Sequence, residues 1–167
     1  IRQTISHIKD DEKSIQKINR EIVILIRCQH PTIVRFIGYS FRDFNNGNNI
    51  TIFMEYMNNG SLHDILEQSK KHPVKNFDNT AKQIILIGIA RAMMYLHKYR
   101  VVHRDLKPGN VLLDENLYPH ITDFGLSKIF SNELSMSQSY QVGTLAYMAP
   151  EIINNLKCSS KIDVYAF

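Results

Sequence analysis

Three short motifs occur in a fixed order along the second half of the chain, and they restrict what it can fold into. They are H-R-D-L-K-P-G-N at residues 103–110, D-F-G at 123–125 and A-P-E at 149–151. A lone D-F-G is a weak signal, because three common residues recur by chance. All three motifs together, in this order and sensibly spaced, form a very specific signal for one kind of catalytic site.

The motifs supply the groups that phosphoryl transfer needs. Asp105 can accept or orient the proton of an attacking hydroxyl, and Asn110 follows at the spacing that brings both residues to one side of a tight loop. Asn110 and Asp123 carry hard oxygen ligands, which suit Mg²⁺. A single Asp in a loop is normally a turn or cap residue, but the joint motif favours the catalytic interpretation.

On these motifs the chain resembles the catalytic region of a eukaryotic protein kinase. The resemblance implies an α+β, two-lobed fold, here incomplete. It implies a partial N-lobe at residues 1–53 with a regulatory helix and two strands, a hinge at 54–60, and a truncated, mainly helical C-lobe at 61–167. Since two lobes need more residues than this, we expect a fragment that folds poorly in isolation.

Two features resemble the serine/threonine kinases. Lys107 stands where their catalytic loop has a lysine, and Gly143-Thr144 precedes the third motif. By resemblance, Asp105, Lys107 and Asn110 are catalytic, Lys107 faces the γ-phosphate, and the Thr144 hydroxyl reaches Asp105. The segment M-E-Y-M-N-N-G-S-L at 54–62 is similar to the tyrosine-kinase-like group of these enzymes.

The resemblance also implies a site for ATP and an activity on protein substrates, with ATP and Mg²⁺ as cofactors. Met54 matches the gatekeeper, and main-chain groups of Glu55 and Met57 are expected to hydrogen-bond the adenine. Leu112 is expected to form the floor beneath it. Glu21 matches the helix glutamate that pairs with an ATP-anchoring lysine.

Arg104 matches the kinases that are controlled by phosphorylation of the activation loop, because its guanidinium can bind a phosphate with two hydrogen bonds. Any single serine in this loop is more simply a solubilising residue. The candidate acceptors are Ser135, Ser137, Ser139, Tyr140 and Thr144.

Other family positions imply packing roles. His103 is expected to pack against Phe124 in a hydrophobic spine whose upper members are Leu25 and Phe36. Asp163 resembles the aspartate that holds the backbone of the catalytic loop. The remaining histidines show no metal-ligand spacing, and we interpret them as ordinary structural or surface residues: His30, His63, His97 and His120.

The pattern breaks before Glu21. No G-x-G-x-x-G occurs in the chain and no V-A-I-K precedes Glu21, while the window expected to hold the lysine reads Q-T-I-S at residues 3–6. Lys9 is too close to Glu21 for a normal alignment. Either the first strands belong to the complete protein and are missing here, which we favour, or they have diverged. The alternative function is therefore a pseudokinase or scaffold.

The periodicity of apolar residues predicts three main helices, at 10–28, from Ser61, and at 78–99, the last one buried on most faces. Gly88 within it indicates a close approach by another element. A hairpin is predicted from 33–39 and 50–54, further strands at 101–102, 111–113 and 120–122, a polar loop at 127–142, and a buried helix at the end of the sequence.

Composition excludes some other classes. The net charge of +4 comes from scattered residues, so no nucleic-acid partner is expected. No apolar run is long enough to cross a membrane. Cys28 and Cys158 lie far apart, which is typical of a reducing compartment and favours a cytoplasmic, intracellular location.

Overall fold

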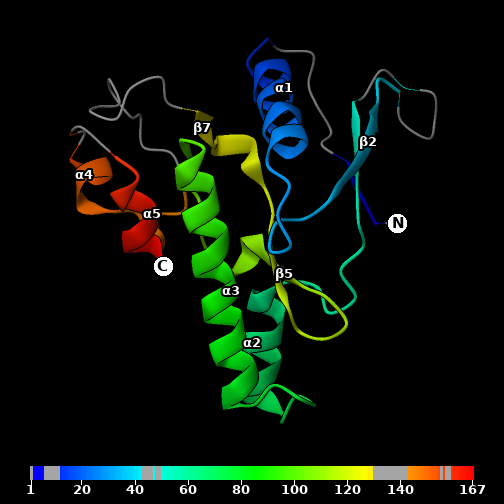
Figure 1. Cartoon of the computed structure of the whole chain (residues 1–167), viewed down its shortest axis with the longest axis vertical. Coiled ribbons are helices and arrows are strands. Elements are labelled where there is room, and N and C mark those ends of the chain that lie inside the picture. The colour runs from blue at the N-terminus through cyan, green and yellow to red at the C-terminus, as the bar shows by residue number, and fades with distance from the viewer. Residues whose placement is uncertain are drawn as a thin grey trace.

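The computed structural model describes residues 2–5, 12–42, 47, 50–129, 143–154, 156 and 159–167. The strands are β1 (Arg2–Ile5), β2 (Phe36–Ser40), β3 (Thr51–Met54), β4 (Val101–Val102), β5 (Val111–Leu113), β6 (Pro119–Ile121) and β7 (Lys128–Ile129). The helices are α1 (Glu12–Arg27), α2 (Leu62–Lys71), α3 (Asn79–Lys98), α4 (Pro150–Ile153) and α5 (Lys161–Ala166). The expected mixture of helices and strands is confirmed (Figure 1).

The largest sheet has the strand order β1-β3-β2, and both of its pairs are antiparallel. The expected hairpin is therefore present, but its first strand begins at Phe36 rather than at Ile33. Ile33 instead forms a parallel bridge with Ile121 of β6. Val34 N–H donates to the Ile121 carbonyl at 3.0 Å, and Ile121 N–H donates to the Thr32 carbonyl at 2.9 Å. These bonds connect the segment after α1 to β6.

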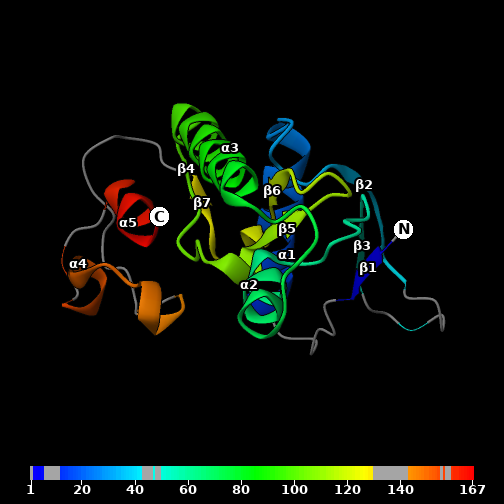
Figure 2. The same cartoon turned by 90° about the horizontal axis from the view of Figure 1, so that it is seen from below.

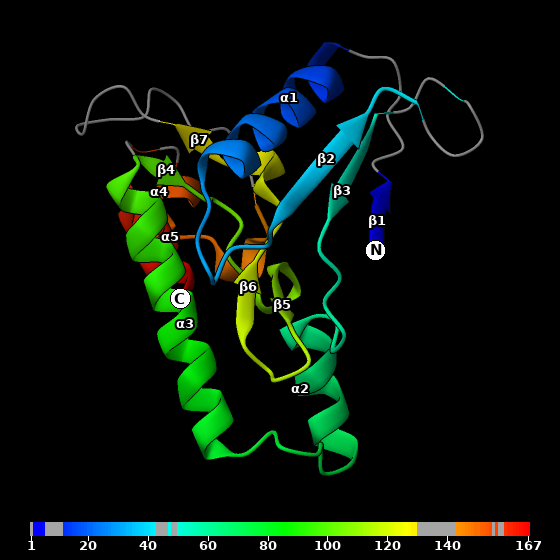
Figure 3. The same ribbon diagram turned by 45° about the vertical axis from the view of Figure 1, so that its right-hand side comes forward.

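Helix α1 ends at Arg27, one residue before the predicted end at Cys28, and residues 10 and 11 of its predicted start lie outside the described part. Its apolar stripe is buried, with Ile18, Ile22 and Leu25 all in the main core. The helix lies across one side of the molecule beside the three-stranded sheet (Figure 3). It packs against the short 3-10 helix Phe124–Leu126, which brings α1 to the second sequence motif.

Both central helices begin at side-chain caps. Ser61, the expected cap of α2, accepts a hydrogen bond from Asp64 N–H, and the Asp64 carboxylate accepts one from Ser61 N–H, each at 3.2 Å. Asp78 caps α3 by accepting from Ala81 N–H at 2.8 Å. Capping of this kind satisfies N–H groups that have no partner within the helix.

Helix α3 is buried along one stripe only, so the prediction of burial on most faces is wrong. Its buried side contains Ile85, Ile89 and Leu96, while Ile87 and Met94 are exposed within the described structure. A helix rich in apolar residues on every side has no periodicity from which its packed face can be predicted.

The predicted close approach at Gly88 is confirmed. A Cβ atom at this position would lie 2.3 Å from Cγ of Pro119, the first residue of β6. The hairpin of β5 and β6 runs between α2 and α3 (Figures 2 and 3). The absence of a side chain on Gly88 therefore sets how closely α3 approaches this hairpin.

The two last helices join a smaller core. Val102 of β4 packs with Ala149, Ile152 and Ile162. These contacts place the A-P-E motif beside the strand that leads into the H-R-D motif. Helix α5 buries Asp163 as well, but Val164, Tyr165 and Phe167 are exposed, unlike the buried helix expected there. The predicted polar loop begins with the short strand β7, paired with β4.

Candidate active site

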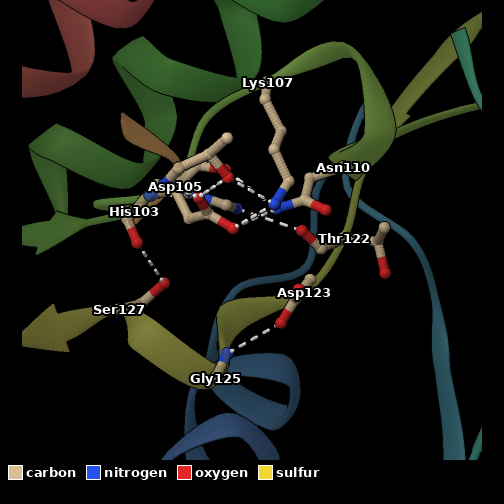
Figure 4. A network of polar contacts seen from close by, with 9 residues as sticks. His103, Asp105, Lys107, Asn110, Thr122, Asp123, Gly125 and Ser127 are labelled. Carbon is tan, nitrogen blue, oxygen red and sulfur yellow. Dashed lines mark hydrogen bonds and ion pairs between the residues drawn. The ribbon is translucent and has the colours of Figure 1, made fainter. Parts of the chain in front are cut away.

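Asp105 lies in the loop between β4 and β5 at the centre of a polar network (Figure 4). Its Oδ1 atom accepts hydrogen bonds from the main-chain N–H and the hydroxyl of Thr144, both at 2.9 Å. Its Oδ2 atom lies 2.8 Å from Nζ of Lys107 and accepts from Nδ2 of Asn110 at 3.0 Å. The expected contact between Thr144 and Asp105 is confirmed, and the three predicted catalytic residues lie together.

The surroundings of Asp105 favour its charged form. Burial by itself raises the pKa of the carboxyl, and it is the largest single influence. The hydrogen bonds from Lys107, Thr144 and Asn110, with the charge of Lys107, together outweigh burial and hold the pKa below its usual value. Asp105 is therefore an ionised carboxylate at neutral pH, which is the form able to accept a proton.

Lys107 connects the two sides of this network. Its ammonium group donates to the Thr144 hydroxyl at 2.7 Å as well as pairing with Asp105. Thr144 in turn donates to Asp105. The lysine, the threonine and the carboxylate thus form a closed triangle of polar contacts at the point where the third motif meets the first.

Asn110 and Asp123 are the residues that could hold a metal ion. The amide nitrogen of Asn110 donates to both the carbonyl and the carboxylate of Asp105, which turns its oxygen away from Asp105. The N–H of Thr122 donates to the Asn110 carbonyl at 3.0 Å and so holds the two loops together. Asp123 is exposed and has a left-handed backbone, with φ 63°. Amide and carboxylate oxygens fit Mg²⁺.

His103 is a structural residue, as expected. It is fully buried, and its ring lies 5.3 Å from the ring of Phe124 between centroids. Its Nδ1 atom accepts from Asp105 N–H at 3.3 Å, so Nε2 carries the proton and donates to the Thr122 carbonyl at 3.0 Å. Both ring nitrogens are therefore engaged, and His103 orders the loop instead of acting as a base.

Asp163 holds the catalytic loop as the resemblance implied. Its carboxylate accepts from the main-chain N–H groups of His103 and Arg104, both at 2.9 Å. His97 also contacts this carboxylate, and the sequence interpretation missed it. No local pattern marks His97, because its partner Asp163 lies 66 residues further along the chain.

Three of the residues expected at the adenine site, Met54, Glu55 and Met57, lie on one continuous segment, and Leu112 lies on β5. Met54 and Met57 are buried in the main core, and Leu112 packs against that core from β5. The segment runs beside β5, because Asn59 N–H donates to the Leu113 carbonyl at 3.1 Å. Glu21 is buried on α1. Strand β1 lies next to β3 and contains no lysine.

The regulatory residues are only partly within the described structure. Arg104 lies in the catalytic loop with φ 72°. Thr144 is engaged with Asp105 and Lys107, which argues against it as a phosphate acceptor. Several other candidates lie outside the described residues: Ser135, Ser137, Ser139 and Tyr140. Lys9 and Cys158 also lie outside them.

Comparisons with known proteins agree with this geometry. A family model described as a protein kinase domain matches residues 2–167. The chain is 38% identical over 163 residues to the cysteine-rich receptor-like protein kinase 46 of Arabidopsis thaliana, covering 93% of this chain and 25% of that protein. It is 37% identical over 164 residues to a probable serine/threonine-protein kinase of Dictyostelium discoideum, covering 97% and 15%.

A third relative is an LRR receptor-like serine/threonine-protein kinase of Oryza sativa subsp. japonica. It is 34% identical over 157 residues, which cover 92% of this chain and 15% of the relative. The chain thus spans a quarter or less of the length of these three curated relatives. Among the described helices, none is both long enough and apolar enough to cross a membrane.

Proposed function

Because the chain belongs to the protein kinase domain family, we propose that the complete protein is a serine/threonine kinase that transfers the γ-phosphoryl group of ATP to hydroxyls of protein substrates. The observation that carries the proposal is the arrangement around Asp105. A buried, ionised carboxylate is held in one orientation by Lys107, Asn110 and Thr144. Phosphoryl transfer requires mainly positioning and charge neutralisation from a protein.

Asp105 is the catalytic base in this proposal. It accepts the proton of the attacking serine or threonine hydroxyl while the hydroxyl oxygen bonds to the γ-phosphorus. The bond from that phosphorus to the oxygen bridging it to the β-phosphate breaks, and ADP leaves. A positioned base of this kind contributes about 10²- to 10⁴-fold to the rate. Fixing the carboxylate with several hydrogen bonds lowers the reorganisation needed when the substrate binds.

Lys107 neutralises charge on the phosphoryl group in transit. Its ammonium group has three donors, two of which are used by Asp105 and Thr144. The third is available for a phosphate oxygen. Thr144 contacts both the lysine and the carboxylate. The preference for serine and threonine hydroxyls is proposed from the likeness to serine/threonine kinases.

Asn110 and Asp123 hold Mg²⁺ through their side-chain oxygens. Their oxygens suit this ion, and Asn110 is oriented by its bonds to Asp105. Mg²⁺ held there would supply positive charge to neutralise the phosphates. Asn110 therefore has two roles, because the same amide that orients Asp105 presents an oxygen to the metal.

The nucleotide base binds along the segment 54–60, the hinge between a smaller lobe at 1–53 and a larger one at 61–167. Glu55 N–H already donates to the Arg35 carbonyl at 3.0 Å, so the Glu55 carbonyl and the main chain of Met57 are the groups for adenine. Met54 is the gatekeeper and Leu112 the floor. Glu21 pairs with a lysine of the complete protein and so helps to orient the phosphates. The complete protein acts on protein substrates in the cytoplasm.

The test is Mg²⁺-dependent transfer of labelled phosphate from ATP to a protein substrate by the complete protein. Asp105→Asn and Asp123→Asn are expected to abolish most transfer, and Glu115→Gln, which changes an exposed carboxylate in the β5–β6 turn, serves as the control. Transfer that survives Asp123→Asn unchanged would contradict the metal assignment.

The second candidate function is a pseudokinase or scaffold, and the absence of a lysine from β1 favours it. It predicts that the complete protein does not turn over ATP although it remains folded and binds partner proteins. Titration with Mg²⁺ and ATP separates the two functions, because a scaffold of this kind gives no nucleotide-dependent stabilisation.

A further inference from the structure

His120 occupies an unusual position in the middle of β6. Its side chain is only 13% exposed, and both ring nitrogens are shielded from solvent and have no hydrogen-bond partner among the described residues. Buried polar groups are normally hydrogen-bonded, so an orphaned ring of this kind requires an explanation.

Two carboxylates face the ring from opposite sides. Nδ1 lies 3.8 Å from Oε1 of Glu55, and Nε2 lies 3.5 Å from Oδ2 of Asp114. Carboxylates are acceptors only. Neutral imidazole has one donor and one acceptor. The lone pair of its acceptor nitrogen would therefore face a lone pair of one of the carboxylates. Imidazolium has two donors and matches both carboxylates.

The other ionisable groups around the ring come from the segment between α1 and β2. Arg35 pairs with the second oxygen of Glu55 at 3.5 Å and is largely exposed. His30 and Cys28 line the same cavity, whose volume is about 460 Å³ and which also contains Glu55 and His120. This space allows the ring and the Glu55 carboxylate to approach each other to hydrogen-bonding distance.

The two carboxylates belong to the segments that flank the proposed adenine site. Glu55 lies in the hinge, where its Oε1 atom also accepts from Arg35 N–H at 2.7 Å. Asp114 begins the β5–β6 turn, and its carbonyl accepts from the Asn59 side chain at 2.6 Å. His120 pairs in register with Leu112, the proposed floor. A charged ring at His120 therefore joins the hinge to the hairpin that carries the floor.

We propose that His120 is a positioning residue for nucleotide binding: its imidazolium form holds Glu55 and Asp114 together and so fixes the hinge against the β5–β6 hairpin. This inference rests on the proposed function. Deprotonation removes one of the two N–H donors. The bridge between the two carboxylates therefore requires the protonated ring.

The test measures adenosine affinity of the complete protein by calorimetry between about pH 5 and 8, the range in which histidine titrates. Adenosine has no phosphate that titrates in this range. We expect the dissociation constant to rise about tenfold with pH, the size expected for a charge-assisted hydrogen bond. His120→Gln is expected to bind weakly at every pH, and His120→Lys, which keeps a positive charge, to bind tightly at every pH.

A positioning role also predicts different effects on KM for ATP and on kcat. His120→Gln is expected to raise KM for ATP with little change in kcat, since the ring does not contact the reacting atoms. His63→Gln is the matched control, because His63 is an exposed histidine of α2. An unchanged pH dependence of adenosine binding in His120→Gln overturns the inference.

An NMR titration of the His120 ring separates this inference from the proposed function. Asp114→Asn keeps an oxygen acceptor in the turn but removes the charge, and it is expected to shift the resonance of the His120 Nε2 atom, which lies 3.5 Å from the Asp114 carboxylate. If the protein binds no nucleotide at any pH, the proposed function is wrong. In that case the charged bridge is still supported if this NMR shift is seen. No shift means that the bridge does not exist.

Discussion

Nε2 of His97 lies 2.9 Å from Oδ2 of Asp163, across 66 residues of sequence. The same carboxylate accepts from the main chain of His103 and Arg104, and it is only 1% exposed. A buried carboxylate is stable only when its lone pairs are satisfied. His97 therefore completes the shell of donors that fixes the catalytic loop, and it connects α3 to α5 through that shell.

Replacing His97 is expected to destabilise the fold. His97→Ala removes one donor from a buried charge, which costs about 1–3 kcal/mol. His97→Gln, whose amide nitrogen reaches a similar position, should restore much of this. Urea unfolding of the complete protein measures the difference, with His63→Ala of α2 as the exposed control. Equal effects of the two alanine variants would mean that the bond to Asp163 contributes nothing.

Lys107 controls the charge state of Asp105. Hydrogen bonds and charge lower the pKa of Asp105 although burial raises it. A group with a lowered native pKa stabilises the fold at neutral pH, and this contribution is lost as the pH falls through the native value. In Lys107→Met, only burial and the hydrogen bonds from Thr144 and Asn110 act on the pKa of Asp105. The pKa of Asp105 should then rise, and acid should destabilise the protein at a higher pH.

The measurement for Lys107 is a carboxyl-carbon NMR titration of Asp105 in both proteins. Lys70→Met is the matched control, because Lys70 pairs with Glu67 on the exposed surface of α2. A titration that is identical in Lys107→Met and in the wild type would show that the ammonium group does not govern Asp105.

Thr144 is expected to act through its hydroxyl rather than its shape. Thr144→Val keeps the volume and the main-chain bond to Asp105 but loses the bonds that the hydroxyl makes with Asp105 and Lys107. Phosphate transfer to protein should fall about 10- to 100-fold, as expected for the loss of a hydrogen bond to a charged group. Thr144→Ser retains the hydroxyl and should keep most of the activity. Loss of activity to the same extent in both variants would indicate a packing role.

Gly88 is expected to resist substitution although alanine favours helices by about 1 kcal/mol over glycine. A Cβ atom would lie 2.3 Å from Pro119 Cγ, so α3 and β6 would have to move apart. Gly88→Ala should lower the free energy of unfolding by about 1–3 kcal/mol. Pro119→Ala in the same chain removes the clashing atom. The double variant should therefore lose less unfolding free energy than the sum of the two single variants. Purely additive effects would contradict the clash.

The parts of the structure that the sequence predicted are those encoded locally. The cap at Ser61 and the stripe of Ile18, Ile22 and Leu25 follow from spacing within one helix. The contacts of Asp105 with Lys107 and Asn110 follow from spacing within one loop. In these cases the neighbours in sequence are the neighbours in space.

The parts that could not be predicted depend on which distant element lies alongside. His97 and His120 have no local pattern that distinguishes them from surface histidines, and their partners become apparent only when α5 and the hinge are in place. The prediction that α3 is buried on most faces is wrong at Ile87 and Met94 for the same reason. Apolar composition predicts that a helix packs against something, but it does not identify the face that does so.

The bridge between Ile33 and Ile121 has a mechanical consequence. The main-chain bonds on both sides of Ile121 fasten the segment that follows α1 directly to β6, and Asp123 follows that strand along the chain. The helix that carries Glu21 and the loop that carries Asp123 therefore share one attachment point. A displacement at the base of α1 must either break these bonds or carry the Asp123 loop with it.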